Sequence, residues 1–373
     1  MEGTACSTVE LAEQPMACCF HGSEPLVAVG LVTGQVQAFR IASNGNASTS
    51  APVEAFTKKP HKESCRAIGF SMAGHRLYTG SADGVMKAVD VATSKVKKWQ
   101  PEAHAAAVNA LLPVAENLVA SGDDEGCIKL WDPRQASEAS ASFSEHTDFI
   151  ADLAYQEKDN CLVAASGDGT ISITDLRKMK LRTRSEEDAD DELLSVAVVK
   201  DGNKAVVGAG TGVLSLYSWG YFNDCSDRFP GHPSSVDALV AFDEDTVLTG
   251  SQDGLIRIIS ILPNSMLGVV GEHGDFPVET LALSHDRLCL ASTSHDTSLR
   301  LWDLRMLQDG AEEEEEIPEQ LEEDAQEGGE KEASDSEDEP QPKKKRKKGK
   351  SGKVTGKQKH RDASFFAGLL KQE

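Results

Sequence analysis

The feature that most constrains the fold is a unit of about 43 residues that repeats through the first 305 residues of this chain. Each copy has a strand of small apolar residues, a turn containing Gly or Asp, and a second strand in which apolar and polar residues alternate. The turn position recurs seven times, at Gly34, Gly84, Gly126, Gly169, Gly212, Gly254 and Thr297. The first spacing is 50 residues and the others are 42 or 43. Such regularity indicates one supersecondary unit in seven copies.

The repeat predicts a closed ring. A sheet of four strands cannot bury both of its faces alone, so copies of it must stack and close on one another. We therefore predict an all-β fold, a seven-bladed β-propeller over residues 16–305. The last copy has no outer strand of its own after residue 305. We expect the N-terminal segment, residues 1–15, to close this blade with its stretch 7–14.

Histidines and aspartates recur at matching places in the copies. The histidines precede the first strand and the aspartates lie in the turn, at His61, His104, His146, His232 and His273 and at Asp83, Asp168, Asp253 and Asp296. Copies that end in Trp-Asp resemble WD repeats, in which such a His and Asp join a Ser or Thr and the Trp in a buried network. The pattern favours structural histidines over general bases. Copies 1 and 5 lack the His and have Thr33 and Thr211 in the Asp position.

Composition narrows the class of function. No apolar run approaches the roughly 20 residues that a membrane-spanning helix needs, and the N-terminal residues lack the pattern of a signal peptide. Eight scattered cysteines without Cys/His ligand spacing predict neither a disulfide framework nor a metal site. We find no phosphate loop, nucleophile elbow or dinucleotide fingerprint, so we expect no enzyme and no cofactor.

Charge is distributed unevenly. The first 305 residues carry 25 Lys and Arg against 42 Asp and Glu, so the predicted propeller repels phosphate backbones. Any contact with nucleic acid is therefore expected from the C-terminal tail. An acidic stretch at 184–192, "RSEEDADDE", is interpreted as a solvated connection between blades 4 and 5, with a contact to a basic partner as the alternative.

Three copies end in Asp-x-Arg, a pattern that predicts a partner-binding rim. The residues are Trp131, Asp132 and Arg134 in copy 3, Asp175 and Arg177 in copy 4, and Trp302, Asp303 and Arg305 in copy 7. Arginine anchors many interfaces because its guanidinium binds carboxylates bidentately and stacks on aromatic rings. The alternative is a surface cation that pairs with the nearby Asp and contributes little. Equivalent strands end on one side of a propeller, so these arginines should share a face.

The tail divides into three parts. Residues 306–342 are acidic and predicted to be disordered, 343–361 are basic, and 362–373 contain a short apolar cluster. The basic part begins with a run of six basic residues, Lys343, Lys344, Lys345, Arg346, Lys347 and Lys348. This run predicts an importin-binding nuclear signal, and the rest of the basic part predicts non-specific RNA contacts. The alternative is a solvated charge run.

Two smaller motifs lie in the same tail. Ser334 and Ser336 each precede an acidic residue by three positions, which makes them candidate phosphosites whose charge would compete with RNA for the basic part. The apolar cluster predicts a short docking helix, with folding back onto the propeller as the alternative. Its residues are Phe365, Phe366, Leu369 and Leu370.

Two resemblances add to this interpretation. Stretches such as "SILPNSMLGVVGEHGDFPVE" and a basic tail ending in "FFAGL" resemble the WD repeat-containing protein 55 family. That resemblance implies a nucleolar protein needed for ribosomal RNA synthesis and processing, with plant-like members that also resemble DDB-adaptor partners. Together with the residue patterns, we expect a monomeric, non-catalytic scaffold of the nucleus and nucleolus, with some cytoplasmic presence, that works with ribosome-assembly factors. Trp-Asp-x-Arg is also similar to the motif by which WD-repeat substrate receptors dock on the DDB adaptor of cullin-four ubiquitin ligases. Thr174 replaces the Trp of this motif in copy 4.

Overall fold

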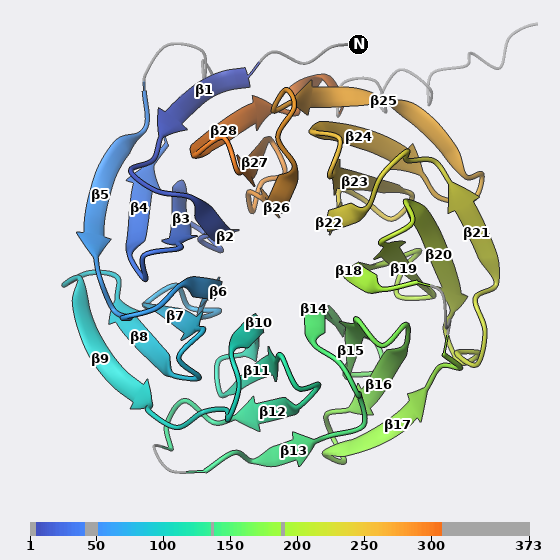
Figure 1. Ribbon diagram of the computed structural model, residues 1–373, viewed down its shortest axis with the longest axis horizontal. Helices are drawn as coiled ribbons and strands as arrows, with labels where there is room; N and C mark the ends of the chain where they lie inside the picture. The colour runs from blue at the N-terminus through green and yellow to red at the C-terminus, as the bar shows by residue number, and fades with distance from the viewer. Residues whose placement is uncertain (1–4, 42–50, 136–137, 188–190, 308–373) are drawn as a thin grey trace, which may run out of the picture. The chain divides into compact units, whose positions relative to one another are not determined.

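The computed structural model describes residues 5–41, 51–135, 138–187 and 191–307, and it shows seven four-stranded sheets arranged in a ring (Figure 1). Every pair of neighbouring strands within a sheet is antiparallel. The predicted fold class, a seven-bladed propeller, is confirmed. Within the described ranges, no helix has the length and apolar character that crossing a membrane requires.

The blades follow one another in chain order. Blade 1 comprises β2 (Pro15–Phe20), β3 (Leu26–Leu31), β4 (Val36–Arg40) and β5 (Val53–Lys58). Blade 2 comprises β6 (Cys65–Phe70), β7 (Arg76–Ser81), β8 (Met86–Asp90) and β9 (Lys95–Gln100). Blade 3 comprises β10 (Val108–Ala115), β11 (Leu118–Asp123), β12 (Ile128–Trp131) and β13 (Ala141–Phe143). Blade 4 comprises β14 (Ile150–Gln156), β15 (Cys161–Ser166), β16 (Ile171–Asp175) and β17 (Lys180–Arg184).

The remaining blades complete the ring. Blade 5 comprises β18 (Leu193–Val199), β19 (Lys204–Ala209), β20 (Val213–Ser218) and β21 (Asp227–Pro230). Blade 6 comprises β22 (Val236–Ala241), β23 (Thr246–Ser251), β24 (Leu255–Ser260) and β25 (Ser265–Glu272). Blade 7 comprises β26 (Val278–Leu283), β27 (Cys289–Ser294), β28 (Ser298–Asp303) and β1 (Ala5–Glu10).

The two ends of the propeller meet in blade 7. Strand β1 pairs antiparallel with β28, so that Ser7 lies opposite Leu301 and Glu10 lies opposite Ser298. Directly after β1, the backbone N–H of Leu11 donates to the carbonyl oxygen of Thr297 at 2.9 Å. The outer strand of the last blade is thus the first strand of the chain, Ala5–Glu10, which overlaps the expected stretch 7–14 only in part.

The core consists of seven hydrophobic clusters, each of which joins two neighbouring blades. The second strands show why the repeat has an apolar run there: all six residues of β3 and of β15 are buried. Such a strand is covered on both faces, by the blade before it and the blade after it. One cluster joins Val27 and Val29 of blade 1 to Leu299 and Leu301 of blade 7 and so closes the ring.

The seven turn positions found in the sequence all have a left-handed backbone. At Gly212, for example, φ is 84° and a Cβ atom would lie 2.5 Å from the carbonyl oxygen of His232 in the next inter-blade loop. Glycine avoids both the strain and the collision. The exception is Thr297, with φ of 57°, in the turn that faces the N-terminal segment instead of a loop between blades.

Antiparallel pairing places the connections on two faces. The arginine face carries the turns between first and second strands and between third and fourth strands, and includes Arg134, Arg177 and Arg305. The histidine face carries the turns between second and third strands and the loops between blades, and includes His104 and His273. The arginines and the histidines therefore lie toward opposite faces of the ring.

Candidate functional site

Complete polar networks occur in blades 3 and 7. In blade 3, His104 bonds to Asp123 through Nδ1 and to Ser121 through Nε2, both at 2.7 Å. The indole N–H of Trp131 donates to the same Ser121 oxygen at 2.8 Å. In blade 7, the corresponding bonds join His273 to Asp296 and to Ser292 at 2.8 and 2.7 Å, and Trp302 donates to Ser292 at 2.7 Å. These are the two copies that end in Trp-Asp.

Blade 4 keeps the network in an altered form. His146 bonds to Asp168 at 3.1 Å through Nδ1 and to Ser172 at 2.8 Å through Nε2. The hydroxyl comes from the third strand because the position that is Ser121 in blade 3 is Ala164 here. In blades 1 and 5 the same position holds the buried residues Val29 and Val207, which have no hydroxyl. These two blades also lack the His and the Trp of the network.

Blades 2 and 6 hold the network only in part. His61 and His232 bond to Thr79 and Thr249 through Nε2, each at 2.8 Å. Their Nδ1 atoms are buried and have no hydrogen-bond partner in the part of the chain that the structure describes. The expected partner Asp253 instead binds Arg257 with its two oxygens at 3.0 and 2.5 Å. The expected bond between His232 and Asp253 is therefore wrong.

The protonation of these histidines follows from their partners. Burial lowers the pKa of His61 to about 4, and burial together with the nearby Arg257 charge lowers the pKa of His232 to about 4. For His104, burial also opposes the charged form, but the hydrogen bonds to Asp123 and Cys127 outweigh it and raise the pKa. The pKa of His273 is lowered, because burial outweighs its bond to Asp296. Buried networks of this kind hold blades in place and leave no free base.

The predicted rim residues of blades 3 and 7 share one geometry. The Arg134 side chain donates from Nε and Nη2 to Asp132, at 2.9 and 2.6 Å, and its backbone N–H donates to the same carboxylate. Arg305 makes the matching bonds to Asp303. The Arg134 side chain is 69% exposed and that of Arg305 is 39% exposed. Each aspartate therefore holds its guanidinium in one orientation while leaving it accessible.

Arg177 is held differently in blade 4. Its backbone N–H donates to Asp175 at 2.9 Å, but its Nη2 reaches the carbonyl oxygen of Lys158, in the turn between β14 and β15, at 3.3 Å. Thr174 replaces the Trp and is buried. The three arginines follow equivalent ends of β12, β16 and β28, so they lie on the same face. The pKa of Asp132 falls to about 2 because the Arg134 guanidinium and backbone N–H donate to it.

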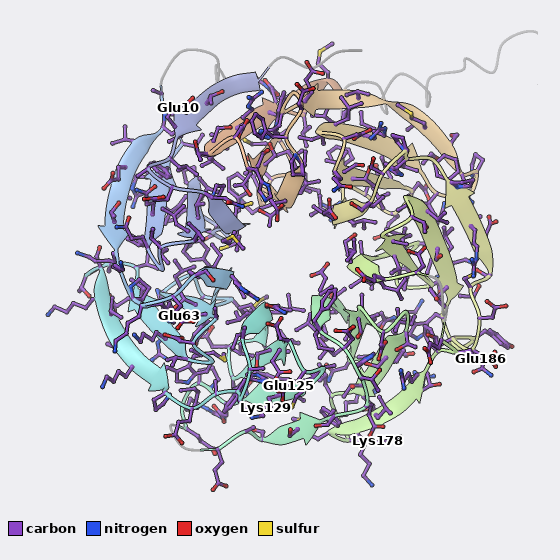
Figure 2. All side chains as sticks on the ribbon, viewed as in Figure 1. Glu10, Glu63, Glu125, Lys129, Lys178 and Glu186 are labelled. Carbon is purple, nitrogen blue, oxygen red and sulfur yellow. The ribbon has the colours of Figure 1, made fainter. Side chains whose placement is uncertain are left out.

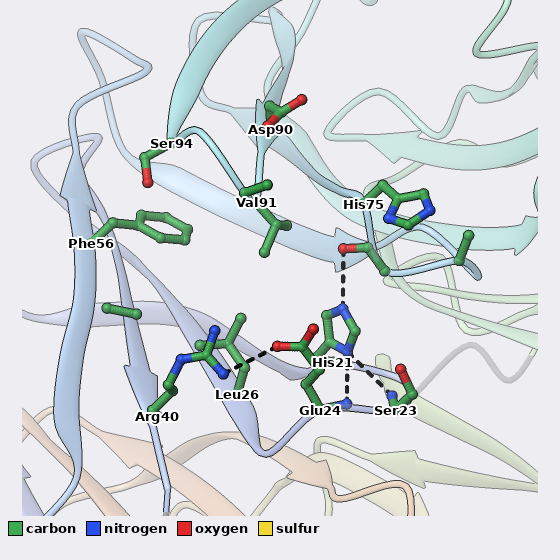
Figure 3. Close-up of a pocket in the computed structure, with 14 residues that line it drawn as sticks. His21, Ser23, Glu24, Leu26, Arg40, Phe56, His75, Asp90, Val91 and Ser94 are labelled. Carbon is green, nitrogen blue, oxygen red and sulfur yellow. Dashed lines mark hydrogen bonds and ion pairs between the residues drawn. The ribbon is translucent and has the colours of Figure 1, made fainter.

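A cavity of about 680 Å³ lies on the arginine face between blades 1 and 2 (Figure 3). Sequence patterns gave no signal for it, because its walls come from three separate turns, β2–β3, β6–β7 and β8–β9, and from strands of both blades. His21 lines it and donates from Nε2 to the Gly74 carbonyl at 3.1 Å, while Nδ1 accepts the backbone N–H groups of Ser23 and Glu24. With both ring nitrogens bonded, His21 fixes the contact between two blades and is not free for proton transfer.

The acidic stretch at 184–192 has a partly structural role. Asp191 accepts the backbone N–H of Thr211 at 3.0 Å and also binds the Thr211 hydroxyl. It thereby supplies a carboxylate to the turn of blade 5, where the sequence has Thr instead of Asp. This contact supports the interpretation of the stretch as a connection between blades.

The remaining predicted sites lie outside the described residues. These are the localisation run Lys343 to Lys348, the candidate phosphosites Ser334 and Ser336, and the docking cluster of Phe365, Phe366, Leu369 and Leu370. The tail parts 306–342, 343–361 and 362–373 are covered only up to residue 307. These interpretations stay predictions.

Comparison with known proteins agrees with this architecture. The WDR55 family model matches residues 6–307. The chain is 41% identical to WD repeat-containing protein 55 of Arabidopsis thaliana over 304 residues, covering 81% of this chain and 84% of that protein. It is 37% identical to WD repeat-containing protein JIP5 of Cryptococcus neoformans, covering 79% and 80%, and 37% identical to human WD repeat-containing protein 55, covering 77% and 74%. Fold, repeats and sequence together place this chain in the WDR55 family.

Proposed function

We propose that this chain is a non-catalytic scaffold of the nucleolus that binds ribosome-assembly factors and acts in ribosomal RNA synthesis and processing. The observation that supports a scaffold is the use of His104, His146 and His273, each bonded at both ring nitrogens inside a blade. The nucleolar role rests on what membership of the WDR55 family implies and on the basic run Lys343 to Lys348. That run also makes importin and RNA the expected partners of the tail.

The test combines depletion with rescue. Cells depleted of the protein should make less mature ribosomal RNA and should accumulate unprocessed precursor, as measured by pulse labelling. Wild-type protein should restore normal levels of both. A variant with Lys343 to Lys348 replaced by Gln should remain cytoplasmic and fail to rescue. The matched control replaces three exposed lysines of β9, Lys95, Lys97 and Lys98, with Gln and should rescue fully. Unchanged ribosomal RNA after depletion would refute the proposal.

A second candidate function is docking on the DDB adaptor of a cullin-four ubiquitin ligase. The observation that favours it is the shared, oriented and exposed geometry of Arg134 and Arg305, held by Asp132 and Asp303. An oriented guanidinium loses less conformational freedom when it binds a partner, which is a source of affinity. Arg177 belongs to the neighbouring blade of Arg134 and extends the same rim.

Affinity capture separates the two functions. Wild type is compared with an Arg134→Ala/Arg177→Ala variant in nuclear extract, and Arg40→Ala is the control because Arg40 is an exposed, carboxylate-paired arginine of the same face. Capture of the adaptor by wild type and Arg40→Ala but not by the double variant supports docking. If no version captures the adaptor while assembly factors remain bound, docking is refuted and the scaffold proposal stands.

A further inference from the structure

The turn between β11 and β12 brings three metal-ligating side chains together. The imidazole of His104, the carboxylate of Asp123 and the thiol of Cys127 each offer a ligand atom, and these atoms lie within 4.8 Å of one another. The residues are too far apart in the sequence to form a recognisable ligand motif. His104 comes from the loop before blade 3, while Asp123 and Cys127 flank the turn at Gly126.

Blade 3 departs from its sister blades at two positions of this turn. The carboxylate of blades 4 and 7 directly precedes the turn position, at Asp168 and Asp296, whereas in blade 3 it comes from Asp123, three residues before Gly126. Cys127 stands where blades 4 and 7 have the hydroxyl residues Thr170 and Ser298. The thiol therefore replaces a hydroxyl that the common network already accommodates, as the contact of Thr170 with His146 shows.

The surroundings hold these groups as metal ligands are commonly held. Nε2 of His104 is bonded to Ser121, and Oδ1 of Asp123 accepts the backbone N–H groups of Glu125 and Cys127 at 3.1 and 2.8 Å. Outer bonds of this kind orient metal-binding imidazoles and carboxylates. The His104 and Asp123 side chains are buried, while Cys127 is half-buried beside the exposed Ser142, so solvent reaches the cluster from the thiol side.

The arrangement does not fit a nucleophilic cysteine with a histidine base. In such a site the thiol and the orienting carboxylate bond to opposite ring nitrogens. Here the carboxylate bonds to Nδ1, and the opposite nitrogen, Nε2, bonds to the Ser121 hydroxyl instead of a thiol, so the ring does not link a thiol to an orienting carboxylate. Three ligand atoms that converge from one turn and one loop are instead typical of coordination around a single ion.

We propose that His104, Asp123 and Cys127 form a binding site for a zinc ion, with water as the fourth ligand. Zinc accepts sulfur, nitrogen and oxygen ligands together at about 2.0–2.3 Å, which places tetrahedral ligand atoms about 3.5 Å apart. Nδ1 of His104 and the Asp123 carboxylate, hydrogen-bonded at 2.7 Å in this structure, would separate to that distance as zinc replaces the proton between them. A thiolate and a carboxylate neutralise the charge of the ion, as a partly buried position requires.

One cation lies nearby and limits the affinity. Figure 2 shows Glu125 and Lys129 beside this turn, and Lys129 donates to the carbonyl oxygen of Ala103 at 2.7 Å. Its charge opposes that of the ion but is directed at a backbone carbonyl and at the ring of Trp131, 5.9 Å away. Removing this charge with Lys129→Met should therefore strengthen zinc binding.

The test uses the full chain without an affinity tag. Zinc affinity is measured by competition with a chromophoric chelator, and cobalt substitution reports thiolate ligation through a sulfur-to-metal charge-transfer band. Cys127→Thr copies the residue of blade 4 and should preserve the fold. It should abolish the cobalt band and weaken zinc binding by more than the ~10–100-fold that loss of an outer bond costs. Cys225→Ser, at another half-buried cysteine, is the matched control and should change neither.

Each outcome decides the proposal. One zinc equivalent that is lost in Cys127→Thr and kept in Cys225→Ser supports the site. Equal zinc affinity and equal cobalt spectra of wild type and Cys127→Thr would overturn it and would leave Cys127 as a substitute for the Thr170 hydroxyl. Circular dichroism and the unfolding midpoint of each variant establish that lost binding does not reflect an unfolded blade.

Discussion

The buried polar network is complete in blade 3 and incomplete in blade 6. In blade 3 a single hydroxyl, that of Ser121, bonds both His104 and Trp131, and a carboxylate takes the other ring nitrogen. In blade 6 the hydroxyl of Thr249 bonds only His232, and Arg257 removes the carboxylate from the network. The difference teaches that the network is modular. A blade keeps its shape without the Trp and the carboxylate but then carries an unpaired buried nitrogen.

The largest expected effect comes from removing the shared hydroxyl. Ser121→Ala leaves two buried groups of blade 3 unpaired, whereas the near-isosteric Thr249→Val leaves one in blade 6. An unpaired buried polar group costs about 1–3 kcal/mol, so Ser121→Ala should lower the free energy of unfolding by about 2–6 kcal/mol and Thr249→Val by about half of that. Denaturant unfolding measures both. Equal losses would show that the Trp131 bond contributes nothing.

The unpaired nitrogens should appear in the pH dependence of stability. His61 and His232 have folded pKa values of about 4 against an ordinary value of 6.5. As pH falls from about 6.5 to about 4, the unfolded chain takes up protons at these sites and the folded chain does not, so stability is lost across this window. Asp152 and Asp237, whose pKa values burial raises to about 6, act in the opposite direction.

A His61→Gln/His232→Gln variant separates the two contributions. Relative to wild type, its free energy of unfolding should rise by about 1–3 kcal/mol per histidine between pH 6.5 and 4. Unfolding is measured at several pH values with both proteins in parallel. Parallel curves would mean that these imidazoles titrate normally in the folded chain.

Two tryptophans test the value of a single indole bond. Trp131→Phe removes an N–H that donates to Ser121, and should cost about 0.5–1.5 kcal/mol beyond the packing loss. Trp99→Phe in blade 2 is the matched change, because the buried Trp99 N–H has no hydrogen-bond partner among the described residues. Thermal midpoints should fall for the first variant and fall less, or rise, for the second. The reverse order would contradict this reading of the networks.

The smallest effect on stability is expected at the arginine face. The Arg134 side chain is largely exposed, so solvent screens its pair with Asp132, and Arg134→Ala should leave the unfolding midpoint nearly unchanged. A large loss of stability would show that the arginine is part of the fold and would weaken its assignment to a partner-binding rim.

The sequence alone was sufficient to predict the architecture, and the reason is physical. A left-handed turn selects glycine at Gly34, Gly84 and their counterparts, and its regular spacing marks the repeat. The network of blade 7 and the participation of His104 in blade 3 were also predictable, because Trp131 and Trp302 mark the copies that hold such networks. These features depend on residues that are close together within one copy.

What the sequence could not predict depends on contacts between distant segments. The carboxylate of blade 3 moved from the usual turn position to Asp123, and only the structure shows that it still reaches His104. Similarly, Asp253 accepts hydrogen bonds from Arg257 instead of bonding to His232, and the spacing of these residues does not reveal this choice of partner. The Arg177 side chain donates to the carbonyl oxygen of Lys158, which lies in the turn of another hairpin, and this contact was also not predictable.

The pairing of β1 with β28 also determines the order of events during synthesis. The first strand leaves the ribosome early, but its partner, which includes Leu301 and Trp302, follows only after six blades have been made. At ~5–20 residues per second this interval lasts tens of seconds. During that time the nascent chain is an open arc with an unpaired strand at its start. Closure of the ring therefore waits for synthesis of β28, and the propeller becomes competent to act only after that strand is made.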